Sequence, residues 1–104
     1  RLRITKQGTS AVDRVQPDDL YLSQNYPNPF NPSTTIRFGT TKRGEVSLKV
    51  FDLLGRTVAT VHNGMLDAGG HNVMFDASAL RSGVYVYRLI TEGQTLSRRM
   101  VVLK

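Results

Sequence analysis

Apolar and polar residues alternate along the chain from Leu20 onward, in short runs that turn signals separate roughly every 8–12 residues. The clearest run is "EVSLKVFD", where every second residue is apolar: Val46, Leu48 and Val50. Successive side chains of an extended chain point to opposite faces, so this run predicts a strand with one buried face. No segment carries apolar residues at a sustained helical spacing. The pattern therefore predicts an all-β domain of antiparallel strands.

Further runs complete a set of about seven strands. In chain order they are residues 20–22, "STTIRFG", "EVSLKVFD", "RTVATVHNG", the segment after "LDAGG", "GVYVYRLIT" and "TLSRRMVVLK". Turns are expected at "DLLGR", where Gly55 takes a positive φ, at residues 67–70 and at Gly93. "GVYVYRLIT" is apolar on both faces and predicts a central strand, whereas residues 78–83 predict a single helical or 3₁₀ turn. Seven such strands favour an antiparallel β-sandwich.

The same alternation predicts the core. Inward positions are Thr34, Ile36, Phe38, Val73 and Phe75, and the aromatic residues Phe51 and Tyr85 are expected in the core as well. Three other aromatic residues lie beside a proline-rich run: Tyr21, Tyr26 and Phe30. Phe30 either plugs one end of the sandwich, which is the favoured interpretation, or joins the two tyrosines in an exposed platform.

The proline-rich run "NYPNPFNPS" holds three prolines and three asparagines within residues 25–32. Proline fixes its own φ, gives up a backbone donor and pushes the preceding residue toward an extended conformation. The run therefore predicts a stiff, extended connection into the sandwich, anchored by Phe30. Residues 1–19 carry little apolar content, so they are interpreted as a linker or the end of a preceding domain, and residues 20–104 as the folded unit.

The composition of the chain limits the kinds of partner that it can have. The chain has no cysteine, and no apolar run has the roughly 18 residues of a membrane helix. No signal peptide opens it, so an exported parent protein would carry its signal outside this fragment. The net charge is +6, but the basic residues are scattered along the strands, which argues against nucleic acid. Either a solvated basic surface or an acidic partner, such as an anionic membrane surface, accounts for them.

Candidate chemistry is sparse. The only histidines are His62 and His71, and His71 with Asp67 would supply just two metal ligands. The five acids from Leu20 onward are separated along the chain, and no nucleophile elbow or phosphate-binding glycine loop is present. The sequence predicts neither a cofactor nor a metal, and it predicts that this domain is not an enzyme.

Four blocks occur in order with family-like spacing: "LSQNYPNPFNPSTTIRF", "VFDLLGRTVATV", "LDAGGHNVMFDASALRSGVYVYRL" and "SRRMVVLK". Together they resemble the type A C-terminal sorting domain of the type IX (Por) secretion system of Bacteroidetes and related phyla. The resemblance covers residues 20–104. The immunoglobulin-like domain of flagellar hook-capping proteins is similar and shares the "PNPFNPSTTIRF" and "GVY" features.

This resemblance implies an immunoglobulin-like or fibronectin-III-like sandwich that acts as a non-catalytic sorting signal at the C-terminus of a larger exported protein. The implied route runs through the periplasm and the outer-membrane translocon to the cell surface or the medium. The implied partners are the type IX secretion components, a surface sortase that cleaves the domain away, and N-terminal cargo domains of the same chain. The resemblance also implies that the cargo can be joined to anionic lipopolysaccharide.

Residues that match the family's motifs fall into two groups. The structural motifs map onto Asn28, Pro29, Phe30, Asn31, Pro32, Asp52, Gly55, Arg56, Val58, Gly69, Gly83 and Tyr85. The terminal motif, implied to be recognised by translocon and sortase, maps onto Arg98, Arg99, Met100, Val101, Val102, Leu103 and Lys104. Members of the family often carry lysines where this chain has Arg98 and Arg99, and the charge is kept.

Position and charge suggest how the terminal motif is read. A sandwich has edge strands, and a partner strand added to the last one would find backbone groups together with basic side chains. Removal of the last five residues is expected to abolish export and to leave a mostly folded sandwich. Cleavage is expected between Gly8 and Asp19, because a sortase needs an accessible segment.

Two other functions stay open at this point. One is a structural or cell-attachment immunoglobulin-like module, and the other is a carbohydrate-binding module of a secreted glycoside hydrolase. The chain has no tryptophan for a sugar-stacking platform, so a carbohydrate site would depend on Tyr21, Tyr26 and Phe30.

Overall fold

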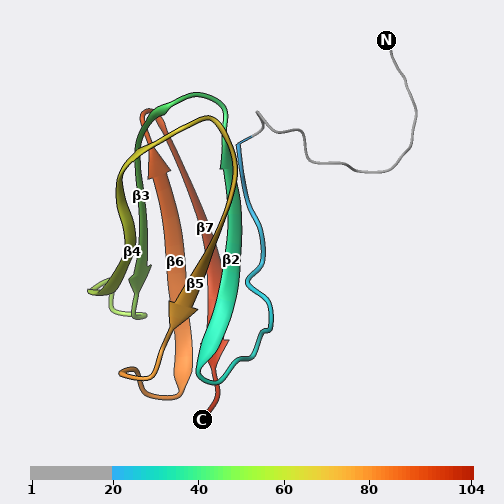
Figure 1. Ribbon diagram of the computed structural model, residues 1–104. Coiled ribbons are helices and arrows are strands. Elements are labelled where there is room, and N and C mark those ends of the chain that lie inside the picture. The colour runs from blue at the N-terminus through green and yellow to red at the C-terminus, as the bar shows by residue number, and fades with distance from the viewer. Residues whose placement is uncertain (1–19) are drawn as a thin grey trace, which may run out of the picture.

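The computed structural model describes residues 20–104 and contains seven β-strands (Figure 1). Their bounds are β1 Tyr21–Leu22, β2 Ser33–Thr40, β3 Gly44–Phe51, β4 Thr57–Leu66, β5 Gly69–Asp76, β6 Gly83–Thr91 and β7 Gln94–Val102. They form a three-stranded sheet in the order β1-β2-β5 and a four-stranded sheet in the order β4-β3-β6-β7. All strand pairs are antiparallel, so the predicted seven-stranded antiparallel sandwich is confirmed.

The chain changes sheets where β4 leads into β5. Between the two strands lie only Asp67 and Ala68, and β5 then pairs along its whole length with β2. Gly69 begins β5 with φ +119°, a conformation that side-chain-bearing residues rarely adopt, which suits so abrupt a corner. As predicted, β6 is central, because it pairs with both β3 and β7.

The core lies between the two sheets. Its most completely buried members come from β2, β3, β6 and β7, and they are Ile36, Phe38, Leu48, Val50, Tyr87, Leu89, Met100 and Val102. The alternation predicted for β2 and β3 is confirmed. Phe30 is only 3% exposed and packs edge-on against Phe75 with 6.3 Å between ring centroids, so it does plug the sandwich.

One local prediction was wrong and another was confirmed. Phe51 lies on the outer face, because it follows the inward Val50 by one residue, and the Arg88 guanidinium lies 4.8 Å from its ring centroid. The single turn predicted before β6 is confirmed, because the Leu80 N–H donates to the Ala77 carbonyl at 2.9 Å, an i→i+3 bond of the 3₁₀ type.

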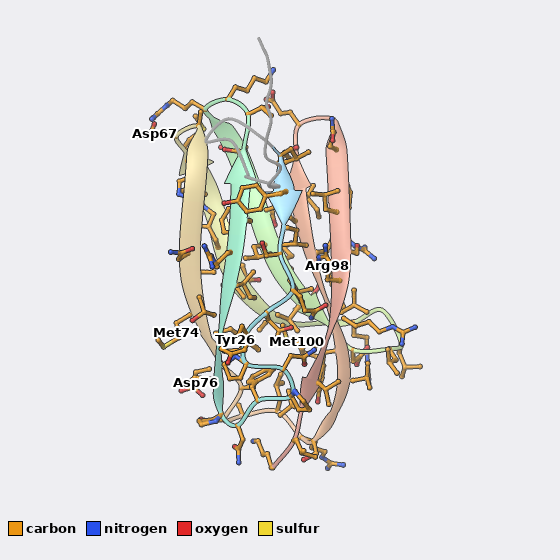
Figure 2. The ribbon with its side chains drawn as sticks, turned by 90° about the vertical axis from the view of Figure 1, so that its right-hand side faces the viewer. Tyr26, Asp67, Met74, Asp76, Arg98 and Met100 are labelled. Atoms are coloured by element: carbon orange, nitrogen blue, oxygen red, sulfur yellow. The ribbon has the colours of Figure 1, made fainter. Side chains whose placement is uncertain are left out.

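Acidic residues gather at one end of the sandwich, together with Lys42 and Arg43. Leu20, where the described chain begins, lines a pocket of 290 Å³ together with Glu45 and Glu92, at the end opposite the C-terminus (Figure 1). Asp67 lies at this end too (Figure 2). Three of the five acids from Leu20 onward therefore gather at the end where the chain enters the fold.

Candidate functional site

The terminal block lies on β7, which is an edge strand of the four-stranded sheet. Met100 and Val102 have no exposed surface, since their side chains point into the core. Arg98, Arg99, Leu103 and Lys104 are exposed, and Val101 is half-buried. The strand thus anchors itself through alternate side chains and presents the others to solvent.

The outer edge of β7 is not open where the sequence suggested it. The Phe30 N–H donates to the Val101 carbonyl at 3.1 Å, and the Leu103 N–H donates to the Phe30 carbonyl at 3.0 Å. The Val101 N–H donates to Oδ1 of Asn28 at 2.9 Å. The proline-rich run therefore covers this edge as a short parallel bridge, and a partner strand cannot add here while the run stays in place.

A second contact closes the edge further along β7. Nε2 of Gln24 donates to the Arg99 carbonyl at 2.7 Å. The Arg98 guanidinium reaches across the sandwich and donates through Nε to the carbonyl of Leu22 in β1. In the described part of the chain Arg99 makes no ion pair or side-chain hydrogen bond, so its charge faces solvent, whereas Lys104 donates through Nζ to the Ser78 carbonyl at 2.7 Å.

A buried polar cluster holds the proline-rich run against the fold. The Asn25 N–H donates to the Tyr87 hydroxyl at 2.8 Å, and that hydroxyl donates to the Ser23 carbonyl at 2.6 Å. Nδ2 of Asn25 donates to Oγ1 of Thr34 at 3.0 Å and to the Pro27 carbonyl at 3.1 Å. Burial raises the pKa of Tyr87, which keeps its hydroxyl protonated and able to donate. The run is thus fixed by hydrogen bonds as well as by its prolines.

Comparison with known proteins shows to which family the chain belongs. The family model described as "Secretion system C-terminal sorting domain" matches residues 24–103, which include the proline-rich run, the central hairpin and the terminal block. The chain belongs to this family. No curated protein and no solved structure matches it. The sorting domain is the signal that directs a protein to type IX secretion, and it is non-catalytic.

The hairpin motif of the sorting domain is organised by one carboxylate. Oδ1 of Asp52 accepts hydrogen bonds from the N–H groups of Leu54 and Arg56, both at 2.9 Å, and Oδ2 accepts from Nε of Arg56 at 2.8 Å. These bonds, the Arg56 N–H first, lower the pKa of Asp52. Gly55 has φ +87°, as the sequence predicted, and Val58 follows in β4, packed against the core.

The Gly-x-Tyr motif supports the turn before β6. Tyr85 is buried and donates through its hydroxyl to the Arg81 carbonyl at 2.8 Å. Gly83 begins β6 opposite Val102, the last residue of β7. In the proline motif, the Pro32 carbonyl accepts from the Ala77 N–H at 2.8 Å, and Pro29 and Asn31 are exposed on either side of the buried Phe30.

Other kinds of site find little support within residues 20–104. No group of three metal-ligating side chains occurs there, and Nε2 of His71 lies 2.9 Å from the Asp67 carbonyl oxygen rather than beside its carboxylate. No helix in this part of the chain is long and apolar enough to cross a membrane. Burial of Phe30 removes one ring from the possible sugar platform, and Tyr26 remains as its most exposed aromatic residue.

Sequence reasoning missed Asn25, Tyr87 and Gln24. Asn25 looked like one turn-forming asparagine among three, and Tyr87 like any inward residue of β6. The one available signal was the inward position of Tyr87, since a buried tyrosine hydroxyl needs a hydrogen-bonding partner. Nothing in the local sequence of Gln24 indicates that it reaches β7.

Proposed function

We propose that the type IX machinery recognises the folded sorting domain through the exposed side chains of its terminal block: Arg99, Leu103 and Lys104. The observation that carries this proposal is that some side chains of β7 are buried in the core whereas others face solvent. Met100 and Val102 are fully buried, and the backbone of Val101 and Leu103 is already hydrogen-bonded to the proline-rich run. Side chains are therefore what this stretch offers a partner in the folded state. Arg98 and the buried residues position them.

The rest of the route belongs to the same proposal. The parent protein reaches the periplasm, crosses the outer membrane by the type IX translocon and arrives at the surface or in the medium. A sortase then cuts between Gly8 and Asp19, which lie outside the described residues, as does the predicted linker 1–19. The cargo, which can be an extracellular hydrolase, is joined to anionic lipopolysaccharide. Membership of the sorting-domain family supports the contact with the type IX machinery and the export to the surface or medium. The periplasmic stage, the cut and the lipopolysaccharide linkage rest on the resemblance of the sequence motifs.

Truncation alone is a poor test of recognition. Deleting Met100–Lys104 would remove two fully buried core side chains and the backbone partners of Phe30. The burial of these side chains argues against the expectation of a mostly folded truncated sandwich, since each such core loss costs roughly 2–5 kcal/mol. Loss of export after truncation would not separate recognition from folding.

Surface substitutions separate the two. A periplasm-targeted fluorescent protein is fused to the domain in a host with type IX secretion, and its location is measured. Arg99→Glu, Leu103→Ser and Lys104→Glu together should leave the reporter in the periplasm while the melting temperature of the purified domain changes little. The matched control is Arg37→Glu, Met74→Ser and Lys42→Glu, on the three-stranded sheet and a neighbouring turn, and it should be exported normally. Normal export of the first variant would refute the proposed recognition residues, and periplasmic retention of the unaltered fusion would refute the sorting role in this host.

A further inference from the structure

The turn between β3 and β4 carries two adjacent leucines that the fold leaves in solvent. Leu53 is 68% exposed and Leu54 is 78% exposed. Single exposed apolar residues are ordinary, but neighbouring ones at the tip of a projecting turn mark a surface for contact. Figures 1 and 2 both show this turn extending away from the body of the sandwich.

The turn is built to hold this shape. Besides the bonds to the Asp52 carboxylate, the Gly55 N–H donates to the Asp52 carbonyl and the Asp52 N–H donates to the Arg56 carbonyl, both at 3.0 Å. Every polar atom of Asp52 is thereby used to close the loop. The leucines are presented by a preorganised turn, so docking them would require little ordering of the chain.

A cationic face adjoins the turn. On the outer face of the four-stranded sheet the register places Lys49 directly opposite Arg88, and Arg99 opposite Val86 one row further on. Like charges directly opposite one another destabilise a sheet. The remaining neighbours in these rows are uncharged: Thr57, Thr60, Phe51 and Ser97. The fold thus keeps a cluster of positive charge without a carboxylate in either row.

The leucines and the cationic face lie on the same side of the molecule. In Figure 2 the β3–β4 turn extends beyond the four-stranded sheet, on the side away from β2 and β5. Its one acid, Asp52, is neutralised by Arg56 at 2.8 Å. Glu45 and Glu92 lie at the other end of the domain, where Leu20 enters. An anionic surface can therefore approach this side without meeting an unpaired carboxylate.

We propose that the β3–β4 turn and the adjoining cationic face form a docking surface for an anionic lipid bilayer. Leu53 and Leu54 enter the boundary between headgroups and acyl chains, and Lys49 and Arg88 contact headgroup phosphates, with Arg56 and Arg99 at the margin. An apolar tip flanked by basic residues on one sheet face matches a bilayer that is negatively charged at its surface and apolar within. The occupant is inferred from this match alone and goes beyond the sorting role.

Vesicle flotation of the complete chain tests the docking directly. The vesicles are phosphatidylcholine with and without phosphatidylglycerol, at low and at physiological salt. The chain should float with the anionic vesicles, release at high salt and stay unbound with the neutral ones, because screening weakens the attraction. Failure to bind anionic vesicles at low salt would overturn the inference, whatever the result of the export assay.

Two variants assign the contacts. Leu53→Ser with Leu54→Ser should weaken partitioning by about a hundredfold, since both leucines are exposed in the unbound fold. Lys49→Gln with Arg88→Gln should weaken it by about fivefold per cation. The matched controls are Tyr26→Ser with Met74→Ser, and Lys42→Gln with Arg43→Gln, none of which lies on this side; they should bind as the unaltered chain does. Two outcomes would overturn the inference. If the leucine variant binds as well as the unaltered chain, a different surface is responsible. If its control loses as much binding as the leucine variant does, the attraction is nonspecific.

Discussion

Replacing Tyr87 by Phe tests whether the buried polar cluster holds the proline-rich run in place. The change deletes one oxygen and keeps the ring, which has no exposed surface. Two backbone groups lose their partner, the Asn25 N–H at 2.8 Å and the Ser23 carbonyl at 2.6 Å. An unsatisfied buried polar group costs roughly 1–3 kcal/mol, and because Ser23 is only half-buried the pair should lower the free energy of unfolding by about 2–4 kcal/mol.

Tyr85→Phe is the matched control. It makes the same chemical change two residues away on the same strand, but the Tyr85 hydroxyl has one partner, the Arg81 carbonyl, at the rim of the core. The expected loss is about 1 kcal/mol. In a domain of this size that difference should separate the two melting temperatures by about 5–20 °C.

Urea unfolding followed by circular dichroism gives the free energies, with an unchanged slope as the sign that both variants unfold from the same compact state. Hydrogen exchange adds a local readout. The amides of Val101 and Leu103 should lose protection in Tyr87→Phe, because the run that covers them loosens, and should keep it in Tyr85→Phe. Equal destabilisation by the two substitutions would refute the reasoning.

Three further predictions follow from single contacts. Phe30→Ala should destabilise the domain by about 3–5 kcal/mol and expose the outer edge of β7, measured as faster exchange at the Val101 and Leu103 amides; protection that stays unchanged would contradict the cover. Gly55→Ala should lower the free energy of unfolding in urea by about 1 kcal/mol. The cause is the positive φ of +87°, since nothing lies within 4 Å of an added Cβ. An unaffected midpoint would show that the turn relaxes. The pKa of Asp52 is lowered in the fold, so the unfolded chain binds more protons in acid and stability should fall as pH drops through about 4. Asp52→Asn should flatten that pH dependence between pH 6 and about pH 3. A variant as acid-sensitive as the unaltered chain would contradict this prediction.

The sandwich could be predicted because apolar and polar residues alternate strictly along its strands. In β2 and β3 the inward residues follow one another at every second position, so strand identity and buried face can both be derived from local sequence. Phe51 shows where composition misleads, because its aromatic ring favoured the core whereas the alternation placed it outside, stacked with Arg88. The position in the strand outweighed the hydrophobicity of the side chain.

The candidate site was less predictable, because its contacts join residues far apart in sequence. The sequence indicated that the proline-rich run is stiff and that Phe30 anchors it, but not that Asn28 and Phe30 lie beside Val101. Local patterns report propensity and burial, whereas the pairing of two irregular edges depends on the whole fold. For the same reason, the terminal block looked like an open edge strand.

The bridge between Phe30 and Val102 also bears on the order of events during synthesis. A ribosome makes the proline-rich run some seventy residues before the strand that it must meet, so roughly 4–14 s pass at ordinary elongation rates. Until Val102 has emerged, Phe30 has no backbone partner and the core lacks Met100. A chain terminated before Met100 would therefore lack a closed sandwich. The fold makes the sorting signal depend on translation through Val102, so export machinery that reads the folded domain would pass over chains that stop before it.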